Sequence, residues 1–156
     1  MSLPYENSTS GERAVNDMQK ILRAFGCGKF GHMMDFDEGV LMVQFEYRGQ
    51  PVSVKASVQG YAAAWLKEHP YTYRTRASKI DHERTAKTIG ATAVYSILRD
   101  WIKGQITAVE TGVLSFEGAF LGQLLLSNGK TMMETVQEKK MLPLLQDEKI
   151  VKLEAK

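Results

Sequence analysis

The sequence is poor in the residues that mark a secreted or membrane-bound protein. It has one cysteine, Cys27, which cannot form an intramolecular disulfide, and this fits a reducing compartment. No run approaches the roughly 18 apolar residues of a membrane-spanning helix. Residues 1–10 are polar and lack the apolar stretch of a secretory signal. We therefore expect a soluble, cytoplasmic protein with no membrane partner.

Catalytic signatures are also scarce. The chain has no Walker-type phosphate loop, no nucleophile-elbow serine and no Cys/His pair at zinc spacing. The histidines, His32, His69 and His82, are far apart in sequence, and none has another candidate ligand four residues away on a helix. Cys27 lies between two glycines with no adjacent base, which indicates an unreactive thiol. We expect a non-enzymatic protein without a cofactor.

One acidic group leaves a metal-dependent nuclease open as an alternative. Four side chains that could ligate Mg²⁺ or Mn²⁺ occur close together: His32, Asp35, Asp37 and Glu38. With Lys55 facing them, the group would resemble a restriction-endonuclease-like site. That arrangement places an acid two residues before the lysine, whereas Ser53 stands there in this chain. A solvated hairpin turn explains the acids more simply, so we expect no metal site.

Length and pattern predict the fold. The 156 residues, 44% hydrophobic and 24% charged, are typical of one globular domain. We predict an α+β fold with an N-terminal helix, a three-stranded antiparallel sheet and a mainly helical C-terminal half around one long helix. The domain is placed at residues 1–142, and residues 143–156 are expected to be a loosely held tail.

Caps and periodicity predict the individual elements. The first helix begins at a capping box, in which the Thr9 hydroxyl and the Glu12 carboxylate bind free backbone amides, and it ends at Gly26. Gly90 and Gly104 lie inside the long helix, where we expect close packing or a bend. The expected strands are 30–36, 40–47 and 52–56, and the expected later helices are 58–69, 79–111, 115–126 and 131–141.

The first seventy residues have the same order of elements as a double-stranded-RNA-binding domain. That family contacts phosphates through lysines at the start of its second helix. The corresponding residues here, Val58 to Tyr61, carry no charge. The resemblance is therefore one of topology only.

Positive charge and aromatic rings are concentrated between Trp65 and Lys103. This segment has eight Lys/Arg and four Asp/Glu, a net charge of +4, and the remainder carries −2, which gives +2 for the chain. Cations interspersed with rings suit a phosphate backbone with accessible bases. The alternative is that half of the rings are core residues and the charges form a solvated helix face. The rings are Trp65, Tyr71, Tyr73, Tyr95 and Trp101.

The leading hypothesis is a nucleic-acid-binding accessory protein, with DNA rather than RNA as the partner. Arg84 and Lys87 lie about one turn apart, so one helix face could follow a phosphate backbone. We expect weak sequence preference and a steep loss of affinity with salt. The expected phosphate contacts are Arg74, Arg76, Lys79, Arg84 and Lys87, and the expected stacking rings are Tyr71 and Tyr73.

A second hypothesis is a protein-binding effector that inhibits a host defence or replication enzyme. It rests on the hairpin edge at 40–56, the apolar tail and the Phe/Leu-rich stretch after Ser115. Homo-oligomerisation would bury the same surface. Methionines suit adaptable contacts, and the candidates are Met33, Met34, Met132 and Met133.

Six distinctive segments lie within residues 40–125: 43–49, 55–57, 60–66, 94–105, 108–112 and 114–121. These segments resemble a largely uncharacterised family of small non-structural proteins of tailed bacteriophages and prophages. The resemblance implies a protein made in the bacterial cytoplasm that assists phage DNA metabolism or acts against a host system. It implies no specific site residues.

Overall fold

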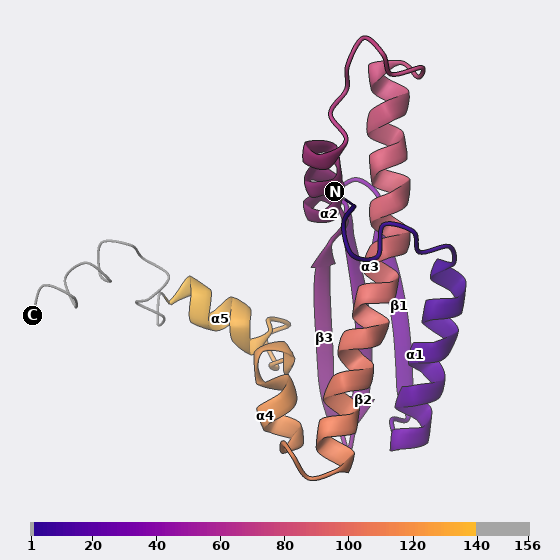
Figure 1. Ribbon diagram of the computed structural model, residues 1–156. Helices are drawn as coiled ribbons and strands as arrows, with labels where there is room; N and C mark the ends of the chain where they lie inside the picture. The colour runs from indigo at the N-terminus through magenta and orange to yellow at the C-terminus, as the bar shows by residue number, and fades with distance from the viewer. Residues whose placement is uncertain (1, 140–156) are drawn as a thin grey trace, which may run out of the picture.

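A computed structural model of the protein describes residues 2–139 and has the expected α+β architecture (Figure 1). Among these residues, no helix combines the length and the apolar character needed to cross a membrane. The predicted boundary at 142/143 and the tail after it lie outside the described residues. The elements are α1 (Gly11–Phe25), β1 (Lys29–Asp35), β2 (Val40–Tyr47), β3 (Gln50–Ser57), α2 (Val58–Glu68), α3 (Lys79–Glu110), α4 (Phe116–Phe120), the 3₁₀ turn η1 (Leu121–Gln123) and α5 (Met132–Glu138).

The three strands form an antiparallel sheet in the order β1-β2-β3, with α1 and α3 packed on one face (Figure 1). Alternate residues of β2 point into this helix-covered face, and Leu41, Val43 and Phe45 are buried there. Their neighbour Gln44 is exposed on the opposite face. Burial along β2 therefore alternates with the period of two expected of a strand that has one face covered.

Helix α1 begins one residue later than the capping box predicted. The side chain of Ser10, rather than that of Thr9, accepts a hydrogen bond from the Arg13 amide, at 3.1 Å. Gly26 ends the helix as predicted, because its φ of 114° lies in the left-handed region that glycine adopts without strain.

The helix predicted at 115–126 continues past Phe120 only as the 3₁₀ turn η1 and is wrong from Leu124 onward. After η1 the chain is extended, and Leu124 forms a β-bridge with Val52 of β3. The Leu125 amide donates to the Pro51 carbonyl at 3.0 Å. The edge of β3 thus supplies backbone partners that replace helical hydrogen bonds. The last predicted helix is present over Met132–Glu138, and its predicted final residues lie outside the described range.

Two glycines of α3 should respond oppositely to alanine. A Cβ at Gly90 would lie 3.0 Å from the Val58 carbonyl oxygen and 3.3 Å from the Ala62 amide nitrogen, so α2 and α3 pack closely there. At Gly104 nothing lies within 4 Å of that position, so of the two expected reasons for this glycine, close packing or a bend, close packing is excluded. We expect Gly104→Ala to raise the free energy of unfolding by about 1 kcal/mol, through helix propensity. Gly90→Ala should lower it by about 1–3 kcal/mol, through overpacking.

Urea denaturation of both variants checks this pair. Each substitution improves helix propensity equally, so any difference between them reports the local packing. Equal stabilisation by both alanines would contradict the close contact between α2 and α3.

Candidate nucleic-acid interface

Helices α2 and α3 form an antiparallel hairpin that extends beyond one end of the sheet. Figure 1 shows the first turns of α3 and the loop that precedes them standing clear of the strands and of α1. Ser78 caps α3, because its side chain accepts a hydrogen bond from the Asp81 amide, at 3.2 Å. We call residues 71–88 of this projecting region the hairpin tip.

The loop of the hairpin tip is shaped by two threonines. The Thr75 amide donates to the Thr72 carbonyl at 2.9 Å, and the Thr72 amide donates to the Thr75 hydroxyl at 3.0 Å. This tight turn exposes Tyr73, whose side chain is 89% accessible. Arg74 donates from Nε to the Tyr73 hydroxyl at 3.1 Å, and its guanidinium carbon lies 5.5 Å from the ring centre. A ring and a cation are thus held together at the apex.

A cluster of rings anchors this loop to the two helices. The ring of His69 stacks on that of the buried Trp65, with centroids 4.4 Å apart. His82 of α3 lies 5.2 Å from Trp65, and its Nε2 is 2.6 Å from the His69 carbonyl oxygen. Tyr71 packs at 5.8 Å from His82 and remains 43% exposed. The base of the hairpin tip is therefore held by side-chain contacts from both helices.

Sequence reasoning missed the pairing of His69 and His82. It judged the histidines to be far apart, but a helix-loop-helix hairpin brings together residues equally distant from its turn. Two residues of the sequence indicate such a hairpin. Pro70 follows the end of α2, and Ser78 caps the start of α3.

The five predicted phosphate contacts all lie on the hairpin tip and are all exposed. Within residues 71–88, five Lys/Arg outnumber two Asp/Glu, which gives a net charge of +3. Arg84 forms an ion pair with Asp81, at 3.5 Å between Nη1 and Oδ1, and both side chains are largely exposed. The exposed set is Arg74, Arg76, Lys79, Arg84 and Lys87.

Three of the five rings in the basic segment are not part of this surface. Trp65 is buried, and Tyr95 and Trp101 pack against the main core from α3. The Tyr95 hydroxyl lies 3.4 Å from His32 Nδ1, and burial raises its pKa above the ordinary value. Only Tyr71 and Tyr73 of this set are exposed on the hairpin tip.

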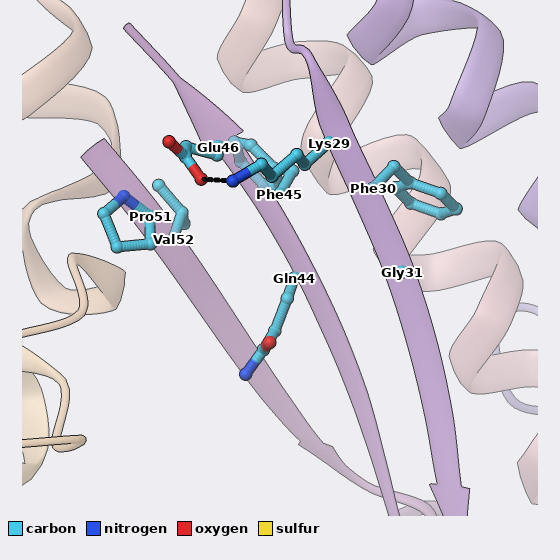
Figure 2. A pocket seen from close by; sticks show the side chains of 8 residues that line it. All are labelled: Lys29, Phe30, Gly31, Gln44, Phe45, Glu46, Pro51 and Val52. Carbon is cyan, nitrogen blue, oxygen red and sulfur yellow. Dashed lines mark ion pairs between the residues drawn. The ribbon is translucent and has the colours of Figure 1, made fainter. Parts of the chain in front are cut away.

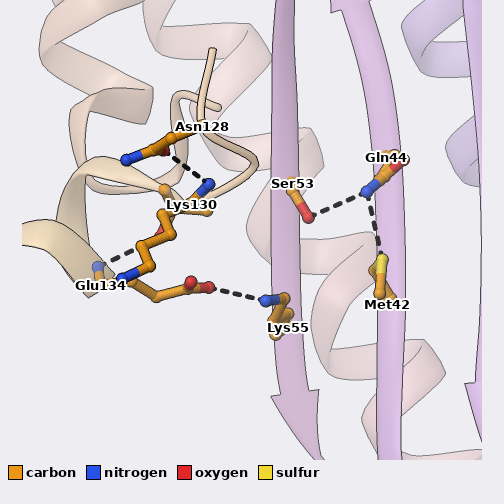
Figure 3. Close-up of polar contacts among 8 residues, drawn as sticks. Met42, Gln44, Ser53, Lys55, Asn128, Lys130 and Glu134 are labelled. Atoms are coloured by element: carbon orange, nitrogen blue, oxygen red, sulfur yellow. Dashed lines mark hydrogen bonds and ion pairs between the residues drawn. The ribbon is translucent and has the colours of Figure 1, made fainter. Parts of the chain in front are cut away.

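The predicted acidic group lies on the β1–β2 turn. Asp35 accepts a hydrogen bond from the Glu38 amide, at 2.9 Å, which is the local turn contact expected of an aspartate. Lys55 points elsewhere, because its ammonium binds Glu134 of α5 at 2.7 Å (Figure 3). This contact holds the pKa of the Glu134 carboxyl below its ordinary value. Over the described residues, no group of three or more His, Cys, Asp or Glu side chains could hold a metal ion.

Cys27 has the environment of an unreactive thiol. It is partly buried beside the main core, and burial raises its pKa to about 11. Because the thiolate is the nucleophilic form, a thiol with this pKa reacts slowly at neutral pH.

The segments on which the protein-binding hypothesis rests are only partly exposed to solvent. In the Phe/Leu-rich stretch Phe116 and Phe120 are buried, whereas Leu121 is exposed. Met33 and Met133 are also exposed, while Met34 and Met132 are half-buried. The apolar tail lies outside the described residues.

Comparison of the chain with protein families, with curated proteins and with solved structures found no match.

Proposed function

We propose that this protein binds nucleic acid, with DNA preferred, through its hairpin tip, as a non-enzymatic accessory protein. One observation carries the proposal: five cations and two exposed tyrosines lie together on a projection. Within residues 2–139, Arg84 is the only one of these cations that forms an ion pair. Cations that lack acidic partners can bind phosphates without first breaking an intramolecular pair. The Tyr73 ring offers a face on which any base can stack.

Fluorescence anisotropy of labelled DNA and RNA, in single- and double-stranded forms, tests the proposal. With three to five phosphate contacts, raising salt from about 50 to 200 mM should weaken binding roughly tenfold to several hundredfold. Single strands should bind more tightly than duplexes, because their bases are accessible to Tyr73. Absence of binding at low salt would refute the proposal.

A protein-binding effector is the second candidate, favoured by the exposed Met33 on β1, an edge strand with one free side within residues 2–139. The two functions separate in a pull-down from bacterial lysate with and without nuclease. Partners bridged by nucleic acid disappear on nuclease treatment, whereas direct protein partners remain. The resemblance to phage proteins supports a role in phage DNA metabolism under the first function and inhibition of a host enzyme under the second.

A further inference from the structure

The two edges of the sheet differ in how they are covered. On the β3 side, Leu124 bridges to Val52, and the Leu125 amide donates to the Pro51 carbonyl. On the β1 side, no further strand pairs with the sheet within residues 2–139. Because an open edge offers a row of backbone donors and acceptors to another chain, β1 is the edge able to accept a strand.

The outward backbone groups of β1 can be assigned from the turn that follows it. The Asp35 carbonyl accepts from the Gly39 amide, at 2.9 Å, so the backbone groups of Asp35 point toward β2. Backbone N–H and C=O groups point alternately to the two sides of a strand, so the groups of Phe30, His32 and Met34 point away from β2. Among the described residues, the backbone hydrogen bonds made in turns and loops do not involve Phe30, His32 or Met34. The outward groups of these three residues are therefore available for pairing.

The charges of β1 are self-complementary. If a second copy pairs antiparallel about a two-fold axis at His32, all seven residues of the strand find a partner residue. Lys29 then faces Asp35 of the second copy, and Asp35 faces the second Lys29, on the sheet face opposite the helices. Lys29 is 78% exposed, and its partner within the chain, Glu46, lies on the side away from this edge (Figure 2).

The sizes of the side chains also match in this register. Gly31, which leaves space on the open face beside Gln44 (Figure 2), falls opposite the exposed Met33 of the second copy. On the helix side, Phe30 falls opposite Met34. Both are half-buried in the single chain, so pairing would complete the burial of two apolar side chains per copy.

The pairing also brings together the segments that flank the strand. Phe36, 87% exposed in the β1–β2 turn, would lie near Gly28 of the second copy, which borders a hollow of about 330 Å³. Arg23 and Lys29 line that hollow, and the acids beside Phe36 would approach them. An exposed phenylalanine and its acidic flank thus face an unfilled basic hollow.

We propose that two copies of this chain pair through β1, edge to edge and antiparallel about His32, to form a continuous six-stranded sheet. The proposal does not depend on nucleic-acid binding, because every backbone group that pairs across this edge belongs to β1. The base of the hairpin tip lies nearby, since Lys87 and Thr88 line a hollow together with Met34, Asp35 and Phe36. The exposed Met33 and Phe36 are explained by burial in the dimer.

A pair of charge variants tests the register. Lys29→Glu places like charges opposite each other in its own dimer, and so does Asp35→Lys. We expect each variant alone to dissociate at least tenfold more readily than the wild type, which should have twice the 17.5 kDa mass of one chain. A one-to-one mixture restores opposite charges at both contacts and should recover the dimer. Sedimentation velocity over a range of concentrations measures all four samples.

Recovery of the dimer on mixing shows that the single variants dissociate because like charges face each other and not because they misfold. Two misfolded variants would not restore each other's dimer. Lys67→Glu, the same charge change on the exposed face of α2, is the matched control and should leave the dimer unchanged. His32→Pro supplies a second test, since it removes an outward N–H while leaving the ladder to β2 intact; it should also weaken the dimer at least tenfold. A monomeric wild type, dimeric single variants or no recovery on mixing would each overturn the proposal.

Discussion

Replacing Arg74 and Arg76 together with glutamate should lower the affinity for DNA about a hundredfold at low salt. Both arginines are exposed on the hairpin tip, and the double change removes two phosphate contacts and adds two repulsive charges. The slope of log affinity against log salt should fall by about two, one for each phosphate that the variant no longer neutralises. Anisotropy titrations at several salt concentrations measure both quantities.

This variant should remain folded, because neither side chain is buried and neither is paired with an acid among the described residues. The matched control is Lys20→Glu with Lys139→Glu, which makes the same change in net charge at exposed positions away from the hairpin tip. An equal loss of affinity in the control would attribute binding to overall charge and contradict a site on the hairpin tip.

The elements whose signals are local were predictable from the sequence. The alternation in β2, the serine cap of α3 and the terminal glycine of α1 each depend on residues within a few positions of one another. Local preference and final structure agree there, so sequence reading succeeds.

The stretch after Phe120 was not predictable because its decisive partner is distant. Leu124 and Leu125 suit a helix by composition, but they meet the edge of β3 some seventy residues earlier in the chain. A run of apolar residues has the same pattern in a buried helix and in a covered extended segment. Only the free backbone groups of β3 decide between the two.

The candidate interface was predicted as a set of residues but not as a shape. The cations and the two loop tyrosines were predicted together because they are near one another in sequence, and the structure adds that they share a projection. Which rings would be exposed could not be predicted. Trp65 and Tyr73 are both aromatic residues of the basic segment, yet packing of α2 on α3 buries the first and leaves the second in solvent.

Phe120→Ala should lower the free energy of unfolding by about 3–5 kcal/mol, which is a large part of the stability of a domain of this size. The Phe120 side chain is fully buried, and its ring lies edge-on to those of Phe45 and Trp101, at 5.4 and 5.7 Å between centroids. It therefore joins α4 to both the sheet and α3. The neighbouring Leu121 is 54% exposed, so Leu121→Ala should cost less than about 1 kcal/mol and serves as the control.

The same variant separates stability from binding. Loss of the Phe120 ring should loosen α4 and the extended segment at Leu124, and hydrogen exchange at the Leu125 amide should accelerate because its bond to the Pro51 carbonyl opens more often. Figure 1 places α4 at the opposite end of α3 from the hairpin tip. Under conditions in which the variant is still folded, its affinity for DNA should therefore equal that of the wild type. A parallel loss of affinity would mean that the binding surface extends to the C-terminal half, and the assignment to the hairpin tip would be wrong.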